Sequence, residues 1–167
     1  MLANTAVLFL GFMMLLAAWT DVRGYTIPNW IPGLLAAVWP AGALAMGLSW
    51  AEAGVSLAVG FVALAVMVGM WLMRWMGGGD AKLIAAGALW FSWPDAMGFI
   101  LMSAVAGGIL ALLLVLARRF VPALPFGGDW MRAGPLAPGA PAPYAVAIAA
   151  GALWVLPSSH LALRMVA

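Results

Sequence analysis

The chain of 167 residues contains no cysteine, a single histidine and only 7% charged residues. The lack of cysteine excludes disulfides, thiolate nucleophiles and zinc sites built from cysteine. With one histidine, a zinc site of another kind is disfavoured as well, so no metal site is expected. A soluble domain carries roughly 25% charged residues, and the shortage of charge therefore excludes an ordinary soluble domain.

Hydrophobic residues make up 67% of the chain, and they gather in long runs. A membrane-spanning helix needs about 20 mostly apolar residues. We therefore expect an all-α, polytopic membrane protein with six transmembrane helices in one domain, residues 1–167, embedded in membrane lipid. The net charge of +2 reflects a few loop arginines and does not indicate a nucleic-acid partner. The apolar runs cover residues 4–19, 30–48, 53–73, 81–93, 96–117 and 144–156.

Positive charges set the expected orientation, because Lys and Arg concentrate in cytoplasmic loops. No positive charge precedes the first run, so we expect an uncleaved first helix rather than a signal peptide. With the N-terminus outside, six of the seven Lys and Arg residues lie on the cytoplasmic side, and only Arg164 lies outside. Glu52, Asp95 and His160 then fall on the outer side, where we expect solvated loop residues.

Two aspartates, Asp21 and Asp80, fall together on the cytoplasmic side, each at the end of an apolar run. A carboxylate at the edge of the hydrocarbon is costly, so it needs a partner or a function. Two facing carboxylates can share a proton, with one activating water while the other protonates a carbonyl or leaving group. Asp80 starts a helix, where the dipole favours the anion, and Asp21 is expected to follow a helix C-terminus. We therefore expect Asp21 to hold the shared proton.

Each of these residues also has a simpler interpretation. Asp80 could cap a helix N-terminus, and Asp21 could pair with nearby Arg23. The glycines at 77–79 could let a substrate backbone approach Asp80, or could merely separate two helices. Lys82 could hold the catalytic loop, attract acidic substrate groups or anchor a helix end at the membrane surface, and Arg23 has the same ambiguity.

Three motifs resemble a known family. Gly77, Gly78, Gly79 and Asp80 fit the GxGD signature of intramembrane aspartyl proteases, and the continuation to residue 83 resembles type IV prepilin peptidases. Residues 21–29 are similar to the first aspartate motif of that family. Residues 143–151 resemble the last helix of its short members, those of Tad and Flp pilus systems.

The resemblance implies that Asp21 and Asp80 form a catalytic pair without any cofactor. The implied reaction cuts the leader from prepilin or pseudopilin substrates, after a glycine that precedes the pilin's apolar helix. It takes place at the cytoplasmic face of the bacterial inner membrane. Larger family members carry a cysteine-containing insertion and a methyltransferase activity that this chain is not expected to have. Asp129 follows a similar glycine pair but lies within a loop, and we do not expect it to be catalytic.

Two rival functions belong to other classes. A small transporter or proton-relay protein would use the aspartates to pass ions, and a non-catalytic pilus-assembly subunit would use them only as caps. The middle of all six runs lacks charge, which favours the peptidase over the relay. The proline- and glycine-rich residues 118–143 are expected to form a cytoplasmic loop that acts as a lid, a partner site or a linker.

Overall fold

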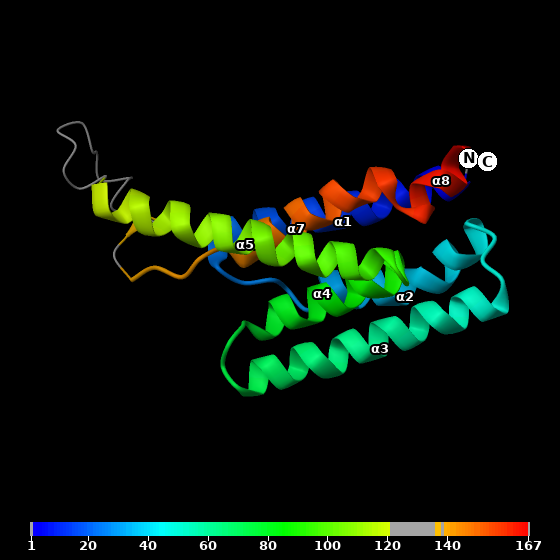
Figure 1. Ribbon diagram of the computed structural model, residues 1–167, viewed down its shortest axis with the longest axis horizontal. Coiled ribbons are helices and arrows are strands. Elements are labelled where there is room, and N and C mark those ends of the chain that lie inside the picture. Colours follow the sequence, from blue (N-terminus) through cyan, green and yellow to red (C-terminus); the bar gives the residue numbers. More distant parts are fainter. Residues whose placement is uncertain (1, 121–135, 138, 167) are drawn as a thin grey trace.

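The computed structural model describes residues 2–120, 136–137 and 139–166, and helices make up most of this part of the chain (Figure 1). No strand occurs within these ranges, which confirms the all-α prediction. The helices are α1 (Leu2–Gly24), α2 (Trp30–Ala45), α3 (Trp50–Leu72), α4 (Gly78–Phe91), α5 (Asp95–Phe120), α7 (Tyr144–Val155) and α8 (His160–Val166), with a 3₁₀ turn at Leu156–Ser158.

Three helices, α1, α3 and α5, are long and apolar enough to cross a membrane. Helices α2 and α7 are apolar but shorter, and α4 has 14 residues. These six helices coincide with the six apolar runs of the sequence. Their lengths and composition fit a multi-pass membrane protein, while six complete crossings and an external N-terminus stay predictions.

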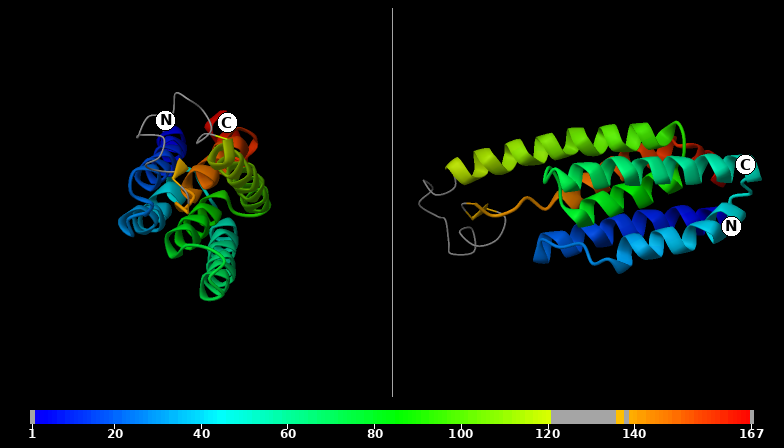
Figure 2. Two further views of the ribbon diagram at one scale, coloured as in Figure 1. Left: turned by 90° about the vertical axis from the view of Figure 1, so that its left-hand side faces the viewer. Right: turned by 90° about the horizontal axis from the view of Figure 1, so that it is seen from below.

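The short helices α4 and α7 form the centre of the bundle. In the end-on view of Figure 2, α7 lies in the middle and α3 lies at the periphery. The buried residues of α4 and α7 are mainly alanine, glycine and larger aliphatic residues, and small residues let helix backbones approach closely. At Gly87, for example, an added Cβ would lie 2.7 Å from the Phe99 ring of α5. The long helices α3 and α5 keep most of their surface exposed, as expected for helices that face lipid.

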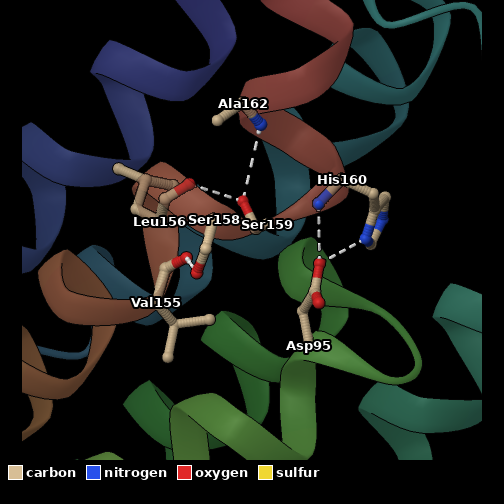
Figure 3. A network of polar contacts seen from close by, with 7 residues as sticks. All are labelled: Asp95, Val155, Leu156, Ser158, Ser159, His160 and Ala162. Atoms are coloured by element: carbon tan, nitrogen blue, oxygen red, sulfur yellow. Dashed lines mark hydrogen bonds and ion pairs between the residues drawn. The ribbon is translucent and has the colours of Figure 1, made fainter.

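The outer-side polar residues lie in the first turns of helices and differ in exposure: Glu52 is exposed, as expected of a solvated residue, whereas Asp95 and His160 are only partly exposed and contact each other. Ser49 and Glu52 form a reciprocal capping box at the start of α3, with the Ser49 amide 2.8 Å from Glu52 Oε2. Asp95 Oδ2 accepts a hydrogen bond from the backbone N–H of His160 at 2.8 Å and also contacts His160 Nδ1. This pair ties the start of α5 to the start of α8 (Figure 3).

Two helix boundaries differ from the apolar runs in a way that matters for the site. Helix α1 continues past residue 19 to Gly24, because polar residues can extend a helix beyond its apolar stretch. Helix α4 begins at Gly78, three residues before its apolar run. Asp21 and Asp80 therefore lie inside helices rather than in the connecting segments. Asp129 and Arg132 lie outside the described residues.

Candidate active site

Asp21 is buried in the last turns of α1, with only 6% of its surface exposed. Its Oδ2 accepts a hydrogen bond from the backbone N–H of Ala145 at 2.9 Å. Ala145 lies in the first turn of α7, where backbone N–H groups have no partner within the helix. Asp21 therefore caps α7 from another helix, at the end where the helix dipole favours a negative charge.

Asp80 is half-buried in the first turn of α4. Its carboxylate accepts a hydrogen bond from the backbone N–H of Gly77, the residue that precedes the helix. A Cβ added to Gly77 would lie 2.7 Å from Asp80 Oδ2, so a side chain there would displace the carboxylate. Gly77 is the N-cap residue of α4, so the prediction that Asp80 occupies this position is wrong. The Asp80 carboxylate instead reaches back to the N-cap amide, which fixes it without using all of its lone pairs.

The structure brings the two aspartate motifs together at one end of the bundle, where α1 ends and α4 and α7 begin (Figure 1). The two carboxylates lie close enough for the charge of Asp21 to act on Asp80. Lys82 Nζ donates a hydrogen bond to Asn29 Oδ1 at 2.8 Å across 53 residues of sequence. A Cβ added to Gly79 would lie 3.1 Å from Ile27 Cβ. Both motifs thus contribute to a single site.

The three glycines do more than separate two helices, because each lies against a different neighbour. Gly77 borders the Asp80 carboxylate and Gly79 borders Ile27. At Gly78 an added Cβ would lie 3.1 Å from Trp71 Nε1 of α3. Together they let the start of α4 pack closely against both the α1–α2 connection and α3.

Arg23 does not pair with Asp21 in the part of the chain that the structure describes. Its guanidinium lies 4.0 Å from the centroid of the Trp19 ring, and both side chains are exposed. The local ion-pair interpretation of Asp21 is therefore wrong. Arg23 belongs to the surface of α1, whereas Lys82 holds the segment between α1 and α2 against α4.

Asp21 lies in the last turn of α1 rather than beyond its end. It therefore remains at the negative end of the α1 dipole, but it also accepts an N-terminal amide of α7. Asp80 lies in the first turn of α4, at the positive end of that helix. The two dipoles at Asp21 oppose each other, and the assignment of the shared proton to Asp21 stays a prediction.

Helix α7 supplies site groups that sequence reasoning did not identify. The Ala145 N–H has no sequence signature, because every residue except proline carries one. The phenol ring of Tyr144 fills the space beside Gly107 of α5, where an added Cβ would overlap it. Tyr144 also lies within electrostatic reach of Asp80. In the sequence, Pro143 immediately precedes the helix. A proline at this position is a signal for a helix start, where the first backbone N–H groups have no partner within the helix.

Within the described ranges, no three or more His, Cys, Asp or Glu side chains gather where they could hold a metal ion. The chemically active groups are two carboxylates and the amides that hold them. Two carboxyl groups that share a proton can act as general base and general acid in hydrolysis.

In a comparison with known protein families, the model of the type IV leader peptidase family matches residues 8–112. The matched region includes both aspartates and ends before α7. A comparison with curated proteins gave no match, and neither did a comparison with solved structures. Because the family match covers more than half of the chain, this protein belongs to the type IV leader peptidase family.

Proposed function

We propose that this peptidase is an aspartyl endopeptidase that removes the leader from prepilin-like substrates, with Asp21 and Asp80 as its catalytic pair. The observation that supports the proposal is that the end of α1, which carries Asp21, and the start of α4, which carries Asp80, lie at the same end of the bundle (Figure 1), where the charge of Asp21 acts on Asp80. Each is held by a backbone amide of a helix start, Ala145 for Asp21 and Gly77 for Asp80. The family match includes both residues.

The proposed reaction needs one carboxyl group protonated and the other ionised. The carboxylate removes a proton from water as the water oxygen attacks the scissile carbonyl carbon. The protonated carboxyl group gives its proton to the carbonyl oxygen, so a neutral tetrahedral diol forms. The diol then collapses: the carboxylate that gave its proton to the carbonyl oxygen takes a proton back from a diol hydroxyl, the C–N bond breaks, and the carboxyl group that gained the water proton passes it to the leaving nitrogen. The pair ends the cycle with one proton, as it began.

The site lies on the side of the bundle that the positive charges assign to the cytoplasm. The proposed substrate is a membrane-inserted prepilin or pseudopilin, cut after a glycine at the cytoplasmic face of the inner membrane. The Tad and Flp systems, whose short peptidases the sequence resembles, are the proposed source of such substrates. The competing relay and assembly-subunit functions gain no specific support from the geometry of the described residues.

A cleavage assay tests the proposal. The detergent-purified protein is incubated with a short-leader prepilin, alongside the variants Asp21→Asn and Asp80→Asn. We expect each substitution to lower kcat/KM by about 10² to 10⁴-fold, the usual contribution of general acid–base catalysis. Asp95→Asn is the matched control, because Asp95 is a hydrogen-bonded carboxylate at the start of α5 that contacts α8 instead of the site.

The control variant should keep wild-type activity, and circular dichroism should show that all three variants are folded. Full cleavage by either Asp21→Asn or Asp80→Asn would remove that residue from catalysis and leave it as a helix cap. Proton flux through proteoliposomes that depends on Asp80, without any cleavage, would replace the peptidase proposal with the relay.

The proposed activity includes no methylation of the new pilin N-terminus. Mass spectrometry of the product, formed by the purified protein with S-adenosylmethionine present, should show the mass of the unmodified mature pilin. A product heavier by one methyl group would contradict this prediction.

A further inference from the structure

An open groove of about 570 Å³ lies between α2, α3 and α4 and ends beside the candidate active site. Asn29 and Lys82, which are hydrogen-bonded to each other, line this end. Lys82 is two residues from Asp80 and is the one charged residue among those that line the groove. A chain that leaves the groove at this end would therefore pass the first turn of α4, which carries Asp80.

The floor of the groove is α4, which packs against both α2 and α3, while α2 and α3 make few contacts with each other. Figure 2 shows α2 and α3 on either side of α4. The floor residues include Ala85 and Ala86, and the α2 wall includes Gly33 and Ala36. Small residues on two adjoining surfaces allow the backbone of another helix to approach closely.

The opposite wall is a stripe of exposed apolar side chains on α3. Leu57, Phe61 and Leu64 lie on one face of that helix at helical spacing, and all three are exposed. The α2 wall extends from Asn29 to Pro40. At about 1.5 Å per residue this is about 17 Å, which is roughly half of a hydrocarbon core of about 30 Å.

One polar feature of the α2 wall favours a polypeptide over a lipid tail as the occupant. Pro40, inside α2, has no N–H to offer the Ala36 carbonyl. Ala36 and Pro40 are both exposed and both line the groove. A lipid tail has no donor for this carbonyl, whereas a helix with hydroxyl or amide side chains supplies one.

We propose that the apolar helix of the membrane-inserted substrate docks in this groove between α2, α3 and α4. Its N-terminal end lies beside Lys82, so that the preceding peptide bond reaches Asp21 and Asp80. This assignment rests on the proposed peptidase function and adds to it the surface that holds the substrate. Helix α4 thus serves both substrate binding and cleavage, since its first turn carries Asp80 and its groove-lining face, which includes Ala85 and Ala86, receives the substrate helix.

The matched pair Gly33→Leu and Gly108→Leu tests the groove by kinetics. At both glycines an added Cβ meets no atom within 4 Å, so either leucine fits on the folded protein. Gly33 lines the groove and Gly108, on α5, does not. With full-length prepilin in liposomes, we expect Gly33→Leu to raise KM by about tenfold or more, because the substrate helix would bind about tenfold more weakly. Gly108→Leu should leave KM unchanged.

Photo-crosslinking tests binding without relying on cleavage. In the Asp80→Asn background, a benzophenone amino acid replaces Gly33 or Gly108 in bacterial lipid vesicles that contain the prepilin. We expect an adduct with the apolar helix of the prepilin at position 33 and none at position 108. Adducts with lipid alone, or with a second copy of this chain, at position 33 would overturn the proposal.

The two experiments separate the groove from the catalytic function. Cleavage by the wild type, combined with equal kinetics of the two leucine variants and no prepilin adduct at position 33, rejects the groove and keeps the peptidase. A prepilin adduct specific to position 33, without cleavage by the wild type, keeps the groove and rejects the catalytic pair.

Discussion

At the scale of single residues, glycine and aspartate act as a unit in the second motif. Gly77 is extended and precedes α4, and its N–H holds the Asp80 carboxylate. The absence of a side chain at Gly77 makes room for Asp80 Oδ2. The first glycine of the GxGD pattern, Gly77, therefore has a steric reason, because a side chain there would displace the Asp80 carboxylate. This reason is separate from any role in admitting a substrate.

Gly77→Ala tests this steric account. The new Cβ would lie 2.7 Å from Asp80 Oδ2, so the carboxylate must move. A misplacement of about 1 Å can cost about 100-fold in rate, and we expect kcat for prepilin cleavage to fall by about tenfold to 100-fold. Gly54→Ala is the control, because an added Cβ there meets no atom within 4 Å. Wild-type kcat in Gly77→Ala would show that the carboxylate position is not limiting.

At the scale of elements, the start of α7 is coupled to α1 through the Asp21 side chain. Residue types alone predicted that the two aspartates share a membrane face, because apolar runs and positive charges are visible in the sequence. They did not predict that Asp21 caps α7, because the donor is a backbone amide 124 residues away. The first apolar run ends at residue 19, whereas α1 continues to Gly24. The cause is related, since a helix continues through polar residues until a residue such as glycine ends it.

Capping and catalysis by Asp21 can be separated by two substitutions. In Asp21→Asn the side-chain oxygen can still accept the Ala145 N–H, whereas in Asp21→Ala this N–H loses its partner. Loss of an N-terminal cap costs about 1 kcal/mol, so we expect Asp21→Ala to lower the thermal midpoint while Asp21→Asn stays close to the wild type. Both variants should lose about 10² to 10⁴-fold in kcat/KM in the prepilin assay.

Thermal unfolding in detergent, followed by circular dichroism, measures the difference between the two variants. Equal midpoints for Asp21→Ala and Asp21→Asn would contradict the capping role. An active Asp21→Asn would contradict the catalytic role and leave the capping role standing.

At the scale of the whole molecule, the site and the Asp95–His160 pair lie at opposite ends of the bundle. The end of α1 and the starts of α4 and α7 lie at one end, and α8 lies at the other, beside the start of α1 (Figure 1). The sequence predicted this separation from its loop charges. It did not predict the groove between α2, α3 and α4, because a groove depends on how far helices diverge, and no local pattern encodes that distance.

The orientation can be measured directly because the chain contains no cysteine. Single cysteines replace Trp75, in the connection between α3 and α4, or Ala51, at the start of α3. Intact cells are then treated with a maleimide that does not cross the inner membrane, after the outer membrane has been made permeable. Because Trp75 lies at the site end and Ala51 at the opposite end, an external N-terminus predicts labelling of Ala51→Cys alone. Labelling of Trp75→Cys alone would place the two carboxylates outside the cytoplasm, and cleavage at the cytoplasmic face would then be impossible.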